Sequence, residues 1–473
     1  MTGPGLFSGI VERVLGADGK PDTRPPSHGV PMLAHWLPYR SFDQKTSLFF
    51  NSGSRGFAIE AAPLVGGDER TAEILTQFLS EAIPAQCCVQ ILHWMSPRIG
   101  DRVSQWFVPR YRARGIYERM ARHRADYLSA GVWRSLSADA PFHLRNHRIV
   151  ISVSVPDTAS VTTDALVSVR EGLVSTLQSI DVPTRVLDPV ALIALIDDMT
   201  SPTTAAGDDP TSYSPFDPIA DQAVRRDIEL RIEPDRLLLR TERFRPTGAD
   251  VDGAPEIGEI YPDTFDLRSF SVRNLPSRWA PWDVARLIGD LFTDKLRMPC
   301  PVATVLCLQY PDEQASASKA GYKFMRTTSL ADSKSARFLP QLREQSREWQ
   351  YVQDELRQGR KLVRCFYSLT SFSPKGQGDA HERIVKSVYR AAGWDLHDDR
   401  YLQIMGLLCA MPITLADGLS RDLERMKRMR TMLTTTACNL APLQGEYLGG
   451  PIPHLLLVGR RGQPFFWSPF ENA

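Results

Sequence analysis

Two apolar stretches decide the fold: CCVQILHWM at Cys87–Met95 and PVATVLCLQY at Pro301–Tyr310. Each predicts a buried strand. Each is followed by a second predicted strand, HRIVISVSV at His147–Val155 and KLVRCFYSLTSF at Lys361–Phe372. Val89 and Ile149 are 60 positions apart, Ala303 and Val363 are also 60 apart, and the halves are offset by 214. The chain is therefore expected to contain two similar modules in tandem.

Helices and further strands alternate around these stretches. A hairpin is predicted around the turn Asn51–Gly56, and the second half opens on another hairpin and the strand Phe265–Pro276. The predicted helices are Glu69–Glu81, a long helical region from Gly100 to Leu128, Thr162–Ser179, one starting at Pro189, and Pro281–Lys295. This alternation predicts an α/β (α+β) fold with sheet-plus-helix modules. The order is compatible with ferredoxin-like units that carry long helical insertions.

Composition shifts divide the chain into five segments. The stretch TSPTTAAGDDPTSYSPFDP is rich in Pro, Ser, Thr and Asp and predicts an exposed linker. The segments are an N-terminal tail at 1–36, a first α/β module at 37–199, the linker at 200–218, a second module at 219–433, and a connector at 434–473.

Bulk properties exclude several classes of protein. The 473 residues carry a formal net charge of +1, so any attraction to nucleic acid or membrane must come from local patches. The seven cysteines are mostly embedded in apolar runs and form no C-x-x-C pair, which fits a reduced cytosolic compartment. No apolar run approaches the length that spans a bilayer, and the first residues do not have the pattern of a secretory signal.

The N-terminal tail contains one amphipathic pattern. Its apolar residues fall at helical spacing on a single stripe, and they are Leu6, Phe7, Ile10, Val11 and Val14. Such a helix can dock on a membrane surface or on a partner protein. The alternative is packing against the body of the protein itself.

Catalytic motifs are missing from the sequence. The run that ends in Asp197-Asp198 resembles a magnesium-binding strand, but Asp188 and Pro189 before it predict a helix start and a core role. His143 and His147 have a zinc-like spacing without a third ligand nearby. Neither G-x-S-x-G nor G-x-x-x-x-G-K-[ST] occurs. We therefore expect no catalytic, cofactor-binding or metal-binding residue in this chain.

The strongest candidate for binding is a basic region from Arg98 to Arg134, in which aromatic residues are interleaved. We select seven of its arginines as candidate contacts: Arg98, Arg102, Arg110, Arg112, Arg114, Arg122 and Arg124. Arginines can neutralise phosphates and aromatic rings can stack on bases, so a helix here could bind single-stranded DNA. The same residue types dominate protein interfaces, and an ordinary solvated helix face is the third possibility. Arg421–Arg430 predicts a second basic helix that docks on an acidic neighbour.

Several blocks together resemble one protein family. They are LPYRSFDQKTSLFFNSGSRGFAIEAAPLVGGDE at Leu37–Glu69, HWMSPRIGDRV at His93–Val103, LRNHRIVISVSVP at Leu144–Pro156 and ACNLAPLQGEYLGG at Ala437–Gly450. In this order they are similar to TraC-type ATPases of conjugative pilus assembly. The resemblance covers the chain from about residue 30 onward, and none of its blocks is a catalytic signature.

The resemblance implies a place in type IV secretion. Members energise pilus assembly and DNA transfer, dock on inner-membrane proteins through an N-terminal half, self-associate, and hydrolyse ATP with Mg²⁺ in a C-terminal half. Because the phosphate-binding motif is missing, we expect a non-catalytic docking and assembly region, cytoplasmic and peripheral to the inner membrane. ATP and Mg²⁺ are implied only for the family's other domain. A truncated product and a stand-alone module both stay open, and LLLVGRRGQPFFWSPF predicts an exposed apolar surface near the C-terminus.

Overall fold

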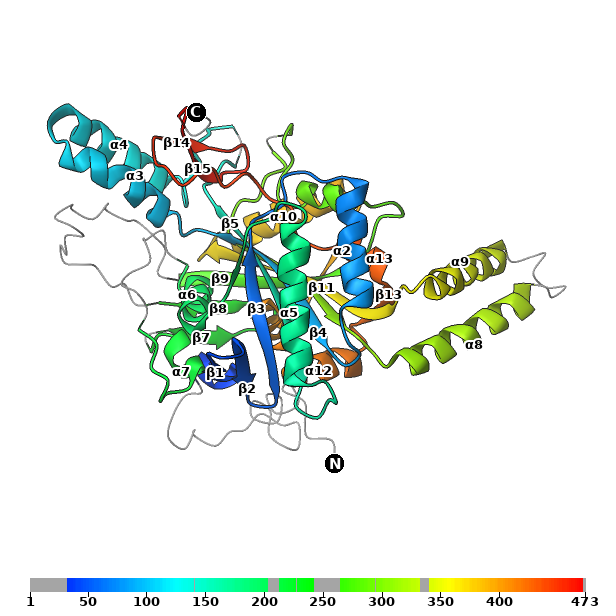
Figure 1. Ribbon diagram of the computed structural model, residues 1–473. Helices are drawn as coiled ribbons and strands as arrows, with labels where there is room; N and C mark the ends of the chain where they lie inside the picture. The colour runs from blue at the N-terminus through cyan, green and yellow to red at the C-terminus, as the bar shows by residue number, and fades with distance from the viewer. Residues whose placement is uncertain are drawn as a thin grey trace.

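The computed structural model describes residues 32–139, 141–202, 212–226, 228–241, 264–293, 295–331 and 340–470. Within them, one large sheet runs in the order β1-β2-β3-β5-β4-β10-β11-β9-β8-β7, and β6, β12 and β13 attach to β3, β9 and β11 (Figure 1). Its strands are β1 (Tyr39–Asp43), β2 (Leu48–Asn51), β3 (Ser54–Ala61), β4 (Cys88–Ser96), β5 (Asn146–Pro156), β6 (Thr184–Val186), β7 (Glu229–Ile232), β8 (Leu237–Arg240), β9 (Thr264–Asn274), β10 (Val302–Gln309), β11 (Leu362–Pro374), β12 (Asp395–Asp398) and β13 (Arg430–Leu433). The predicted α+β class is confirmed.

Strands β4 and β10 form the middle of the sheet. Both are buried along nearly their whole length: every residue of β4 is buried, and in β10 Gln309 alone is partly exposed. A strand without a polar face cannot lie at a sheet edge or face water, so it requires a neighbour on each side and a helical layer above and below. The two strands meet this need by pairing with each other, antiparallel, with Ile91 opposite Leu306.

Each half of the chain repeats one arrangement around these central strands. The first half runs β3, α2 (Glu69–Glu81), β4, β5, α5 (Thr163–Gln178), β6, and the second runs β9, η2 (Pro281–Arg286), β10, β11, α10 (Gly378–Ala391), β12. In both halves the strand that opens the unit pairs with the third and the fourth strands. This is the β-α-β-β-α-β order of ferredoxin-like units. The segment boundaries proposed from composition stay predictions.

Helices cover both faces of the sheet. One core lies under α2, α5, α10, η2 and α13 (Thr434–Asn439). The other lies under η1 (Leu33–Trp36), α6 (Pro189–Thr200), α7 (Ile219–Ala223), α11 (Gln403–Ala410), η4 (Leu415–Leu419) and α12 (Ser420–Arg425). Two helical hairpins project away from this body, α3 (Gly100–Arg112) with α4 (Gly115–Ala130), and α8 (Glu313–Ala331) with α9 (Pro340–Arg357) (Figure 1).

Local sequence signals explain the starts of α2, α5 and α6. The Asp68 carboxylate accepts a hydrogen bond from the Thr71 N–H at the start of α2, and Thr162 caps α5 in the same way. Asp188 caps α6 and Pro189 is its first residue, so the predicted helix is confirmed. The predicted helix Pro281–Lys295 is wrong beyond Arg286. Gly289 has a φ of 127°, which a helix cannot accommodate, and the chain turns there.

A buried amide side chain joins the two halves across the sheet. Gln90 of β4 donates hydrogen bonds to the carbonyls of Cys409 and Met411, at 2.7 and 2.8 Å, and accepts one from the Leu415 N–H at 3.2 Å. It thereby satisfies the backbone of the segment that follows α11. Because that segment is irregular and buried, its polar groups have no secondary-structure partners of their own.

Replacing Gln90 by alanine should lower the unfolding free energy by about 3 kcal/mol, because several buried backbone groups lose their partners at once. Urea denaturation of the full chain measures the change in midpoint. The matched control is Gln309→Ala on β10, a partly buried glutamine with one weak bond to Arg364 at 3.4 Å. Equal midpoints for the two variants would contradict the role assigned to Gln90.

Candidate interaction surface on the α3–α4 hairpin

The basic region folds as two antiparallel helices, so the single long helix expected from sequence is wrong. Arg114 and Gly115 both have positive φ angles, 54° and 64°, and reverse the chain between α3 and α4. Two successive left-handed residues cannot continue a helix, and glycine makes the second one inexpensive. The helices pack through bulky residues of α3, including Phe107, against Ala121 and Ala125 of α4.

A C-terminal hairpin lies against α3. Its strands are β14 (Leu455–Val458) and β15 (Pro464–Trp467), and Leu456 and Phe466 join the small core between α3 and α4. The other hairpin face carries Leu455 and Trp467, which are 45% and 46% exposed. Within the described residues, this confirms the exposed apolar surface that the sequence predicts near the C-terminus.

Three candidate arginines bind backbone carbonyls of this hairpin and of the segment that leads into it. Arg102 donates to the Leu448 carbonyl and Arg124 to the Leu456 carbonyl, both at 2.6 Å. Arg110 donates to the His454 carbonyl at 2.6 Å and stacks over Trp106 with its guanidinium 4.3 Å from the ring centroid. Burial lowers the pKa of Arg102 and of Arg110. These side chains therefore serve an internal contact that the sequence alone does not reveal.

Arg98, at the base of the α3–α4 hairpin, forms ion pairs within the protein. It pairs with Asp197 at 2.9 Å and lies 3.9 Å from Asp198, whose side chain is 1% exposed. Asp198 further accepts hydrogen bonds from the Trp94 indole at 2.9 Å and the Arg148 guanidinium at 3.1 Å. The apolar run that ends in this aspartate thus belongs to the core, as its helix-start signals predict.

The other three candidates lie toward the tip of the hairpin. Arg112 and Arg114 are exposed where the chain reverses. Arg122 pairs with Glu118 one turn away, at 3.3 Å, and lies over the ring of Tyr111.

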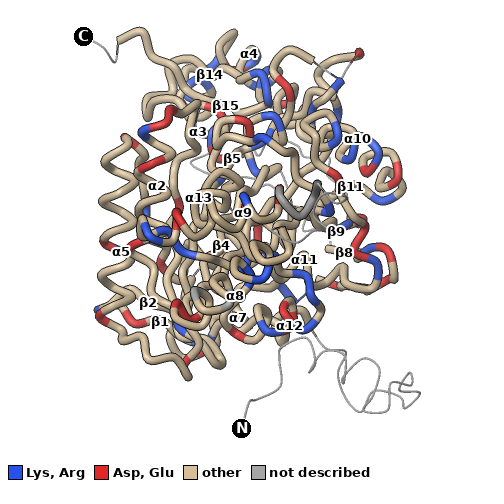
Figure 2. The backbone as a smooth tube through the Cα atoms, turned by 90° about the vertical axis from the view of Figure 1, so that its right-hand side faces the viewer, with Lys and Arg blue, Asp and Glu red and all other residues tan. Residues whose placement is uncertain are grey.

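Figure 2 shows Lys and Arg interspersed with Asp and Glu along the backbone, so the described part of the chain presents both signs of charge.

The outer face of α4 carries an apolar stripe that faces solvent. Its four members are Ile116, Tyr117, Met120 and Tyr127, which are 59%, 65%, 65% and 56% exposed. Their helical spacing places them on one side of α4, opposite the alanines that pack on α3. We call this set the α4 stripe. Tyr117 and Tyr127 are among the aromatic residues interleaved in the basic region, whereas Ile116 and Met120 were not selected from the sequence, although the helical period could have added them.

The N-terminal helix with Leu6, Phe7, Ile10, Val11 and Val14 lies outside the described residues. His147 forms a buried pair with His93, with 2.9 Å between their ring nitrogens, and burial lowers the pKa of both. The basic run Arg421–Arg430 is not one helix, because α12 ends at Arg425 and Lys427 adopts a φ of 55°.

Among the residues that the structure describes, no group of three or more His, Cys, Asp or Glu is arranged to hold a metal ion. None of the helices in the described part of the chain is long and apolar enough to cross a membrane.

Replacing Asp198 by alanine should cost about 3–5 kcal/mol of unfolding free energy, because two arginines lose a buried counter-charge. Asp197→Ala is the matched control, since that side chain is 27% exposed and pairs with Arg98 at 2.9 Å. Its expected cost is below about 1 kcal/mol. Thermal and urea unfolding compare the two. A control variant that is as unstable as Asp198→Ala would refute a special role for the buried aspartate.

The chain is similar to known proteins of one family. A family model described as "TraC protein" matches residues 33–415. Protein TraC of Escherichia coli (strain K12) is 25% identical over 434 residues, which cover 88% of this chain and 47% of that protein. The chain spans about half the length of the curated relative it matches. On the extent of the family match, the chain belongs to the TraC family.

Proposed function

We propose that this chain is a docking and assembly region of a TraC-like protein in conjugative pilus assembly, and that the α4 stripe contacts another protein of that machinery. Family membership supports a role in conjugation. The observation that supports docking is an exposed row of four large apolar side chains on a helix that projects from the body (Figure 1). Aromatic and methionine side chains next to arginine are typical of the centres of protein interfaces.

The arrangement of the arginines favours a protein partner over DNA. A single-stranded DNA groove requires a row of free cations beside stacking rings. Arg98, Arg102, Arg110 and Arg124 instead bind the protein's own carboxylates and carbonyls. The rings of Trp106 and Phe107 are buried. DNA binding through the exposed pair Arg112 and Arg114 is the alternative function.

The proposed setting is the inner face of a type IV secretion complex. Partners would be inner-membrane secretion proteins and further copies of a TraC-like protein, and the chain would be peripheral to that membrane. The proposal assigns no ATP or Mg²⁺ site to the described residues. Transport of DNA would be a property of the whole machine and not of this surface.

The double variant Tyr117→Ala/Met120→Ala tests the stripe. We expect at least about a tenfold loss of conjugative transfer in cells that make it in place of the natural chain, because two central interface side chains are removed. Its unfolding midpoint should not change, since both side chains are 65% exposed. Mating frequency and pilus counts are the measurements.

The matched control is Tyr322→Ala/Met325→Ala on α8. These residues are 64% and 66% exposed, have the same spacing, and lie on the other projecting hairpin. Equal loss in both variants would remove the case for α4. The DNA alternative predicts salt-dependent binding of a single-stranded oligonucleotide that Arg112→Ala/Arg114→Ala abolishes and that the stripe variant retains.

A further inference from the structure

Positive charge is concentrated around the α4 stripe. Residues 110–127 carry six arginines and two acidic residues, a formal net charge of +4, whereas the whole chain carries +1. The rest of the sequence therefore has a net charge of −3. A local excess of one sign sets up a potential that attracts the opposite charge and raises the rate of encounter. The stripe thus combines an exposed apolar row with a positive surround.

Two arginines beside the stripe have no partner within the protein. Arg114 and Arg119 are exposed, and within the described residues neither side chain forms a hydrogen bond or an ion pair. Arg122 differs from them, because it pairs with Glu118 at 3.3 Å. The charges of Arg114 and Arg119 are therefore available to another molecule.

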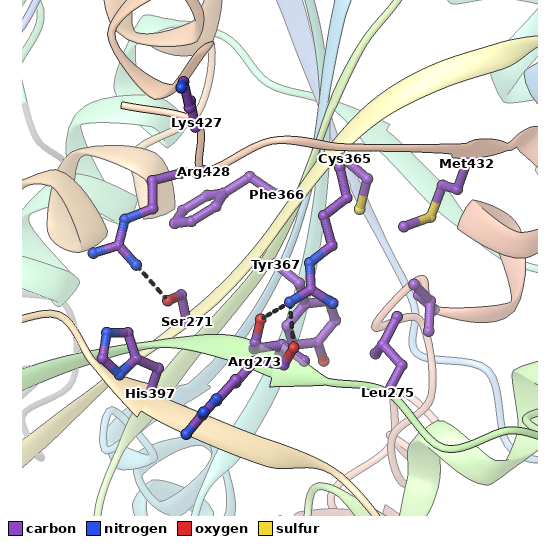
Figure 3. Close-up of a pocket in the computed structure, with 13 residues that line it drawn as sticks. Ser271, Arg273, Leu275, Cys365, Phe366, Tyr367, His397, Lys427, Arg428 and Met432 are labelled. Carbon is purple, nitrogen blue, oxygen red and sulfur yellow. Dashed lines mark hydrogen bonds between the residues drawn. The ribbon is translucent and has the colours of Figure 1, made fainter. Parts of the chain in front are cut away.

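The cavity in the second half of the sheet does not gather its cations in the same way. Where β9 leaves β11, strand β13 pairs with β11, and the fork between them leaves a cavity of about 470 Å³ (Figure 3). Arg428 there pairs with the buried Asp399 at 3.1 Å, and Arg430 donates to two backbone carbonyls of β9. Figure 3 shows Lys427 and Arg273 at opposite ends of the cavity.

Arg114 occupies a backbone position that favours glycine. Its φ is 54° and its ψ is −176°, a conformation in which a side chain is strained. Gly115 follows with a φ of 64° and completes the reversal between α3 and α4. A glycine at position 114 would make the same turn at lower cost, so the turn by itself does not explain an arginine there. A contact between its guanidinium and an acidic partner does.

The order of the side chains along α4 favours a protein partner over a membrane. Ile116, Arg119, His123 and Tyr127 are all exposed and follow one another at spacings of three or four, so Arg119 and His123 lie within the apolar row. A helix that lies in a membrane surface buries its apolar face, which here would bury Arg119 without a counter-charge. A carboxylate on a protein partner can pair with that arginine.

The form of the stripe also limits what the partner is. The backbone groups of a helix are bonded to one another, so a partner reaches only the side chains of α4. Rows of side chains at a spacing of three or four pack well into the grooves of another helix. A second copy of the chain that used the same face would bring like charges together, which costs affinity. A helix with acidic side chains meets these requirements.

We propose that the α4 stripe binds an acidic amphipathic helix of another protein. Its apolar residues would pack on Ile116, Met120 and Tyr127, and its carboxylates would pair with Arg119 and, at the tip of the hairpin, with Arg114. The proposal rests on the docking function proposed above and adds the chemistry of the partner to it. It involves binding only and no chemical step.

The test reverses the two charges in the variant Arg114→Glu/Arg119→Glu, made in cells in place of the natural chain. Conjugative transfer should fall at least about tenfold, because glutamates would face the carboxylates of the partner. Arg114→Lys/Arg119→Lys keeps both charges and should stay within about threefold of the natural chain. The unfolding midpoint of the purified variants should not change, since both side chains are exposed and without internal contacts among the described residues.

The matched control is Arg326→Glu/Arg347→Glu, which reverses two exposed arginines on the α8–α9 hairpin. Equal loss of transfer in this control would overturn the proposal. Comparison with Tyr117→Ala/Met120→Ala separates the two levels of the argument. If that variant loses transfer and the charge reversal does not, docking stands and the acidic partner is wrong. If neither loses transfer, both proposals fail.

Two binding measurements distinguish the other anionic partners. The purified natural chain should bind neither a single-stranded oligonucleotide, followed by fluorescence anisotropy, nor phosphatidylglycerol vesicles, followed by co-sedimentation, at an ionic strength of about 0.15 M. Absence of both, together with the loss of transfer on charge reversal, supports a protein partner. Binding to either one that Arg114→Glu/Arg119→Glu abolishes would overturn the proposal in favour of nucleic acid or membrane.

Discussion

The pairing of β4 with β10 is the constraint on which the rest of the structure depends. Each strand is too apolar to tolerate an edge, so the halves must share one sheet with these strands at its centre. Because the pairing is antiparallel, Gln309 lies opposite Cys88, far from Ser96. The α3–α4 hairpin follows Ser96 and the α8–α9 hairpin follows Gln309. The two hairpins therefore leave the sheet at opposite ends, as Figure 1 shows, and offer two separate surfaces.

Buried polar contacts then fix irregular segments on this frame. The chain after α11 contains Ile413 with a φ of 63°, and it is held by Gln90, by the Asn51 amide at 2.9 Å, and by the Tyr39 hydroxyl at 2.6 Å. The C-terminal hairpin is held in a similar way by arginines of α3 and α4. In both places side chains of regular elements donate hydrogen bonds to backbone carbonyls of a neighbouring segment. Many polar side chains of this chain thus form hydrogen bonds with its own backbone.

Sequence patterns predicted the elements better than their contacts. The strands Cys88–Ser96 and Val302–Gln309 and the helix Glu69–Glu81 follow from apolar runs, periodicity and the cap at Asp68, all of which are local. The reversal at Arg114 was missed, because a single glycine in a basic run is a weak signal. The internal role of Arg102 could not be foreseen, since its acceptor, the Leu448 carbonyl, is 346 residues away. Composition indicates that arginines are present and does not reveal what they bind.

The fork between β9 and β11 has no equivalent in the first half of the chain. There, β3 pairs with β5 without interruption from Ser54 to Ala61. The second half has the same strand order but admits β13 at the position where β9 leaves β11. A break in only one of two similar units is not required by the fold, because the other unit closes the same ladder completely. The departure leaves a cavity of about 470 Å³ that is lined by Lys427, whose φ is 55°.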